Sequence, residues 1–213
     1  NGHLEIVKWL IEISEKKGLG TINIHDQDED AFRSACYKGH LHITKWLIEI
    51  SREKNLGDIN IHADNEYAFR WVCFKGHLEV AKWLIEISEK KGLGVINIHI
   101  HDENAFRFAC WYDHLEVAKW LIEISEKKGL GTINIHIRDE FAFRVCHYGH
   151  LEIAKWLLTL YSYRELKNLN HSLAKEELEN RKKINIELIL YLFERKFKLL
   201  DIHAIAISWR EYL

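Results

Sequence analysis

The sequence of 213 residues contains no proline and no methionine, and it has no long apolar run. No segment approaches the roughly 18 uncharged residues that typify a membrane-spanning helix, and no basic segment followed by an apolar one opens the chain. We therefore expect an intracellular, cytoplasmic protein with no membrane partner. Because the chain opens on Asn1 instead of methionine, we also expect it to be part of a longer one.

An excess of positive charge is also missing. The chain has 30 basic and 32 acidic residues, which gives a formal net charge of −2. General nucleic-acid binders need a basic surface that displaces counterions from phosphates, so we expect no specific nucleic-acid partner. Hydrophobic residues make up 47% of the chain, a share that is ordinary for a folded protein with a sizeable core.

The most informative feature that is present is an internal repeat. The motif "GHLEIVKWL" begins at residue 2, and close variants begin at residues 39, 76, 113 and 149, so the spacing is 37, 37, 37 and 36. A period of this length is typical of a solenoid, in which each unit buries its apolar face only by stacking on its neighbours.

Each unit contains the pattern of two helices and a link. In "AFRSACYK", the apolar Phe32, Ala35 and Cys36 are spaced i, i+3, i+4, which predicts a short helix ending before Gly39. The following "HLHITKWLIEIS" has a wider apolar face and predicts a longer helix. The "INIH" segment and the polar residues after it are too short for another helix, so we expect an extended loop or hairpin tip.

Taken in this order, these features resemble the ankyrin repeat family. The "AFRSAC" helix stands where that family has its P-L-H-x-A-A segment, Gly39-His40 matches its turn, and Ile59-Asn60 matches its link. The resemblance covers about residues 1–158 and implies an all-α, ankyrin-type helix-turn-helix solenoid with hairpin-like links. The lengthened "SEKKGLG" segment makes the chain a long-repeat variant, similar to the ankyrin arrays encoded by giant viruses of amoebae.

One departure from the family pattern affects the expected hydrogen bonds. An arginine replaces the histidine of the family motif in each unit, which leaves open how neighbouring units bond to one another. The positions are Arg33, Arg70, Arg107 and Arg144.

The repeat does not extend over the whole chain. We expect residues 1–158 to form the array, with an incomplete first unit and about four further repeats. Residues 159–213 leave the pattern but contain amphipathic segments such as "NIELILYLFERKF", which predict helices. We expect a helical C-terminal cap, because a terminal repeat needs a polar outer face. A docking segment for another protein is the alternative.

Cysteine and histidine recur at fixed repeat positions, and this spacing argues against catalysis. Stacked helices lie too far apart for disulfides, so buried thiols are expected at each repeated cysteine. These are Cys36, Cys73, Cys110 and Cys146. Histidines of the turn and the link form ladders and not clusters, which disfavours a metal site. No P-loop, G-x-S-x-G or H-E-x-x-H motif is present, so we expect neither an enzyme nor a cofactor.

Candidate binding residues are those that differ between units. The end of the first, inner helix varies in its rings, and the resemblance implies that it lines the concave face of the array. Aromatic anchors contribute much of the energy of protein interfaces. The candidates are Tyr37, Lys38, Phe74, Lys75, Trp111, Tyr112, His147 and Tyr148. The alternative is that these rings only cover neighbouring helices, and Trp71 and Phe108 are expected to pack between units.

Acidic residues before each inner helix form the second candidate surface. The candidates are Glu29, Glu66, Glu103 and Glu140, each with aspartates beside it. An acidic surface suits a basic partner. The alternative is structural, because acids at a helix N-terminus stabilise its dipole and cap its free N–H groups.

These patterns lead to two hypotheses on function. The first is a non-catalytic, monomeric scaffold that binds a host or cellular protein through the concave inner-helix face and the hairpin tips. The second is a substrate-recognition adaptor of a larger enzyme complex, such as a ubiquitin ligase. Either would act in the cytoplasm, including that of a host cell.

Overall fold

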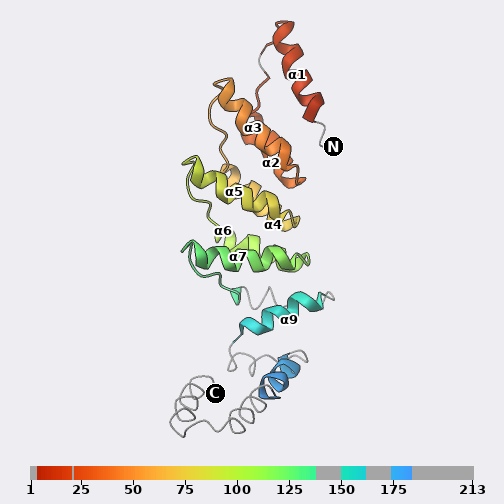
Figure 1. Ribbon diagram of the computed structural model, residues 1–213, viewed down its shortest axis with the longest axis vertical. Coiled ribbons are helices and arrows are strands. Elements are labelled where there is room, and N and C mark those ends of the chain that lie inside the picture. The colour runs from red at the N-terminus through yellow and green to blue at the C-terminus, as the bar shows by residue number, and fades with distance from the viewer. Residues whose placement is uncertain (1–3, 21, 138–149, 162–173, 184–213) are drawn as a thin grey trace, which may run out of the picture. The chain divides into compact units, whose positions relative to one another are not determined.

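The computed structural model describes residues 4–20, 22–137, 150–161 and 174–183. Within these ranges every regular element is a helix, which confirms the all-α class (Figure 1). None of the described helices is both long and apolar enough to cross a membrane. Two compact units divide the chain, residues 1–142 and residues 143–213. The predicted boundary after residue 158 stays a prediction.

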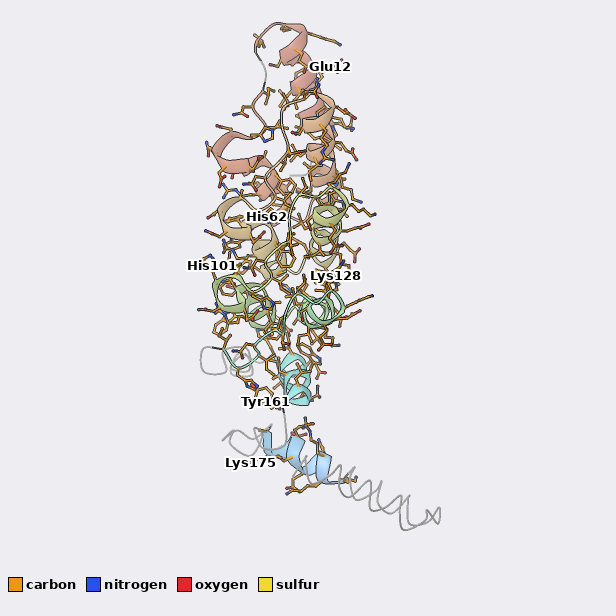
Figure 2. The ribbon with its side chains drawn as sticks, turned by 90° about the vertical axis from the view of Figure 1, so that its left-hand side faces the viewer. Glu12, His62, His101, Lys128, Tyr161 and Lys175 are labelled. Atoms are coloured by element: carbon orange, nitrogen blue, oxygen red, sulfur yellow. The ribbon has the colours of Figure 1, made fainter. Side chains whose placement is uncertain are left out.

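The first unit is a stack of helix pairs. Its inner helices are α2 (Asp26–Tyr37), α4 (Ala63–Phe74) and α6 (Ile100–Trp111), and its outer helices are α3 (Leu41–Glu53), α5 (Leu78–Lys90) and α7 (Leu115–Lys127). An outer-type helix, α1 (Leu4–Lys16), precedes them. Each of these inner helices packs on its own outer helix, and α4 also packs on α2 and on α6. Figure 2 shows the two columns side by side, with His101 on the inner side and Lys128 on the outer side.

The core lies between the two columns and repeats with the sequence. In the three "AFR" segments that the structure describes, the phenylalanines Phe32, Phe69 and Phe106 are at most 1% exposed. Each outer helix contributes a buried leucine from its "KWL" segment, namely Leu47, Leu84 and Leu121. The apolar faces predicted from helical spacing are therefore the faces that are buried.

The repeated cysteines are core residues. Cys36, Cys73 and Cys110 are free thiols with at most a trace of exposed surface, which confirms the predicted buried thiols. Burial in apolar surroundings disfavours the thiolate and raises the pKa of Cys36 to about 12, with a smaller opposing effect of the Thr44 hydroxyl. Cys146 lies outside the described residues.

The turn between α4 and α5 favours glycine for two reasons, although the turn between α6 and α7 has Asp113 at the same position with φ +61. Gly76 has φ +74, a left-handed conformation that most side chains adopt at a cost, and a Cβ added there would lie 2.5 Å from Nδ1 of His114. His114 belongs to the turn of the next repeat, and its Nε2 lies 3.0 Å from the carbonyl oxygen of Phe74. His77 makes the same contact with the Tyr37 carbonyl at 3.2 Å. The turn histidines therefore join successive repeats.

The long "WLIEISEKKGLG" segment forms the second half of each outer helix and its end. Glycine ends the helix in the left-handed conformation, as at Gly92 with φ +62. Exposed ion pairs connect neighbouring outer helices at this end, including Lys128 with Glu89 at 2.6 Å and Lys54 with Glu15. This segment is therefore part of the scaffold.

The second unit contains α9 (Leu151–Leu160) and a helical segment at residues 174–183. The guanidinium of Arg181 donates to the carbonyl oxygens of Leu158 and Tyr161 at 2.7 and 2.8 Å. These carbonyls belong to the C-terminal end of α9, where helix carbonyls lack partners within the helix. The remaining residues of the predicted C-terminal cap lie outside the described ranges, so the cap itself stays a prediction.

Candidate partner-binding surface

The backbone is unusual where each link runs into its inner helix, over the first residues of α2, α4 and α6, which we count with the link. Three successive residues have positive φ, with φ values of 50, 56 and 65° at Gln27, Asp28 and Glu29. The same left-handed turn recurs at residues 64–66 and 101–103. Left-handed geometry costs roughly 1–2 kcal/mol per residue for L-amino acids, although Asp and Asn tolerate it better than most. The link is thus a strained, repeated turn, so of the two predicted alternatives, an extended loop or a hairpin tip, the extended loop is wrong.

A buried glutamate offsets this strain. The Glu66 carboxylate lies 2.8 Å from Nδ1 of His62, in its own link, and accepts the backbone N–H of Asn97 in the next link at 3.1 Å. Glu29 and Glu103 make the equivalent bonds, and all three glutamates are only 5–6% exposed. In this conformation the three carboxylates serve the array itself and are not presented to a partner. Glu140 lies outside the described residues.

The arginines that replace the family histidine hold the same turn. Arg107 donates from Nε and Nη2 to the carbonyl oxygens of Asp102 and His101, at 2.6 and 3.0 Å. Arg70 makes the same two bonds to its own link. Arg33 differs, because it donates from Nη2 to Gln27 and from Nη1 to Asp64 of the next repeat, and its buried Nε has no partner.

Hydrogen bonding between repeats comes from the link histidines as well as the turn. Nε2 of His62 lies 2.9 Å from the carbonyl oxygen of Leu93, and Nε2 of His99 lies 3.0 Å from that of Leu130. Each acceptor belongs to the following repeat. Figure 2 shows His62 between the two columns of helices, where it can reach both. Histidines of the link and the turn thus connect the units, whereas the position at which the family motif has its histidine is occupied by arginine.

Aromatic side chains of the inner helices form a continuous cluster, which we call the ring belt. It consists of Tyr37, Tyr67, Trp71, Phe74, Phe108 and Tyr112. Trp71 bridges α2 and α4 with a centroid distance of 5.5 Å to Tyr37, and Phe108 bridges α4 and α6 with 5.7 Å to Phe74. The expectation that Trp71 and Phe108 pack between units is therefore confirmed.

The ring belt differs from the core in being partly accessible. Its rings are half-buried, except for Tyr112, which is 45% exposed. Nζ of Lys75 lies 4.8 Å from the ring centre of Tyr37 and 4.9 Å from that of Phe74, within the range of a cation–π interaction. The structure thus combines aromatic surface and exposed cations at the turn end of α2 and α4.

The predicted binding residues are only partly brought together. Tyr37, Phe74 and Tyr112 lie in the ring belt beside the exposed Lys38 and Lys75. Trp111 is half-buried at the end of α6, and His147 and Tyr148 lie outside the described residues. Tyr67 was not predicted, although its spacing of four residues before Trp71 placed both on one helix face.

A pocket of about 340 Å³ lies beside the ring belt, between α2 and α4. Its lining consists of Asp30, Arg33, Ser34, Tyr37, Lys38 and Tyr67. We call it the Ser34 pocket. It contains rings and groups of both charges, so it suits an amphipathic side chain better than a purely apolar one.

Titration within the array is altered where a histidine is covered by its neighbours. The pKa of His114 is lowered, mainly because burial penalises the charged ring. This effect outweighs the carbonyl of Phe74 and the carboxylate of Asp113, which favour the charged ring.

Among the residues that the structure describes, no three potential ligands gather into a metal site.

Stacked helix pairs joined by a tight turn and a link define a helical repeat solenoid, a class whose members bind through surfaces and not through a buried active site. Residues 35–139 match the family described as ankyrin repeats (3 copies), and residues 1–48 match ankyrin repeats (many copies). The chain therefore belongs to the ankyrin repeat family, whose members generally mediate protein–protein interactions and are typically not catalytic. No curated protein and no solved structure matches it.

Proposed function

We propose that the chain is a non-catalytic scaffold that binds a protein partner through the ring belt and the exposed acids of the links. The observation that carries the proposal is the accessibility of the ring belt. The core phenylalanines of the same helices are fully buried, whereas the rings of the belt keep exposed edges beside Lys38 and Lys75. Exposed aromatic surface with a polar rim is typical of protein interfaces.

The negative charge of the exposed acids in the links supports a partner with basic residues. With the three glutamates engaged inside the links, the exposed acids are the aspartates at positions 26, 28, 30, 64 and 102. Asp64 also contacts Arg33, so its charge is partly offset. Complementary charge of this kind acts mainly on the association rate and on its dependence on salt.

The test is affinity purification with mass spectrometry, using this chain as bait. We expect partners to be lost with Tyr112→Ser, which removes an accessible ring of the belt, and with Lys75→Glu, which removes the exposed cation beside it. Glu49→Lys on the exposed face of α3 is the matched control and should keep them. Circular dichroism checks that each variant is folded. Partners that bind all three variants equally would place the interface elsewhere.

A second experiment addresses the basic partner. Asp28→Asn retains a residue that tolerates left-handed φ but removes a charge. If the partner is basic, this variant binds more slowly at low salt and about as fast as the wild type at high salt. Equal rates at low salt would remove the charge argument but leave the ring belt as the interface. The monomeric state and the cytoplasmic location stay predictions.

A further inference from the structure

The Ser34 pocket occurs where the repeat pattern changes. Position 34 is equivalent to 71 and 108, because the units are 37 residues apart. Those two positions carry Trp71 and Phe108, which pack into the ring belt, whereas α2 carries a serine that is exposed. The small side chain leaves open volume beside Tyr37 and Tyr67, at a place where the neighbouring repeats each have a ring.

The walls of the pocket are held in place by contacts between repeats. The guanidinium of Arg33 lies 4.9 Å from the ring centre of Tyr67 and bonds to Asp64 at 3.3 Å. Arg33 thereby fixes a side chain of α4 from its position on α2. A site with fixed walls loses less conformational freedom on binding than a mobile one.

The polar groups of the pocket decide what kind of ring fits. The side chains of Asp30 and Ser34 make no hydrogen bond to any other part of the chain that the structure describes, so both can accept one. Arg33 and Lys38 outnumber Asp30 in the lining, which disfavours a cationic side chain. A neutral ring with an N–H or O–H edge satisfies both the aromatic walls and the free acceptors.

We infer that the Ser34 pocket accepts a tryptophan or tyrosine side chain of the protein partner, as an anchor that replaces the ring missing at position 34. This rests on the proposed scaffold function and specifies the chemistry that the partner must present. A single ring buried in a fixed pocket is the kind of contact that dominates the energy of an interface.

The test is an NMR titration of the protein with amino-acid amides. N-acetyl-tryptophanamide and N-acetyl-tyrosinamide are expected to shift the backbone amide signals of Ser34, Tyr37 and Tyr67, with a dissociation constant of about 1 mM. N-acetyl-leucinamide and N-acetyl-argininamide should cause much smaller shifts. Shifts of equal size with all four probes, or no shift with any of them, would overturn the inference.

Two pairs of variants make the test specific to the pocket. Ser34→Trp supplies the ring that Trp71 supplies in α4 and should abolish the shifts, whereas Ser34→Ala keeps the space and should retain them. Asp30→Asn removes the charged acceptor while preserving shape, and we expect it to weaken tryptophanamide binding about threefold to tenfold. Amide spectra confirm that each variant is folded. Unchanged binding in both Ser34→Trp and Asp30→Asn would place the probes elsewhere.

The outcome is separable from that of the scaffold proposal. If Ser34→Trp still captures the same partners as the wild type while Tyr112→Ser loses them, the pocket is not an anchor site although the ring belt is an interface. If both lose the partners, the pocket and the belt act in one surface.

Discussion

Replacing Glu66 with alanine tests the explanation of the left-handed link. The Glu66 carboxylate is 6% exposed, bonds to His62 at 2.8 Å and accepts the N–H of Asn97 at 3.1 Å. Hydrogen bonds to a charged group contribute about 1.5–3 kcal/mol each. Because His62 is partly open to solvent, we take the lower value for each of the two bonds. Together they predict a loss of about 3 kcal/mol in the free energy of unfolding.

The assay is urea denaturation followed by far-ultraviolet circular dichroism. Glu66→Gln, which keeps one acceptor oxygen but loses the charge, should be intermediate. Glu49→Ala removes the same charge from an exposed helix position and should change the free energy by less than about 0.5 kcal/mol. If Glu66→Ala matches Glu49→Ala, the carboxylate does not stabilise the link, and a partner-binding role for these glutamates becomes the better explanation.

Three further predictions follow from the same structure. Gly76→Ala should destabilise the array by about 2 kcal/mol, and clearly more than Gly92→Ala in thermal unfolding, because both have positive φ but only Gly76 is covered by the His114 ring. The pKa of His114 is lower in the folded state than in the unfolded chain, so the unfolded chain binds more protons below pH about 6.5. The free energy of unfolding should therefore fall as the pH drops below this value, and His114→Gln should weaken this pH dependence. Cys36, with its pKa raised to about 12, should resist a thiol reagent at pH 8 in native protein and react at once in denaturant, whereas rapid native reaction would contradict its burial.

Sequence reasoning succeeded where a property depends on local spacing. The 37-residue period, the burial of Phe69 and the free thiol of Cys73 follow from apolar residues that recur on one face of a helix. The preference for glycine at the turn is also local, because positive φ disfavours most side chains, and the aspartate at position 113 belongs to the few residue types that tolerate it. These features are repeated, so each unit supports the same conclusion independently.

The candidate site was predicted less completely. Within a single unit, acidic residues next to a helix N-terminus are typical of a solvent-exposed loop. Nothing in the local sequence shows that the Glu66 carboxylate is buried and accepts the N–H of Asn97, 31 residues later. Tyr67 was missed for a similar reason, since its contact with Arg33 joins two repeats.

The sequence by itself determined the repeat, the helix pairs and their buried faces, because hydrophobic periodicity requires burial whatever the neighbours are. Only the tertiary structure decided which polar groups are used inside the array and which remain available. Glu66 is buried because the next repeat supplies a backbone donor, and Ser34 opens a pocket because α4 places Tyr67 opposite it. Both depend on stacking geometry, which sets distances between residues that are far apart in the chain.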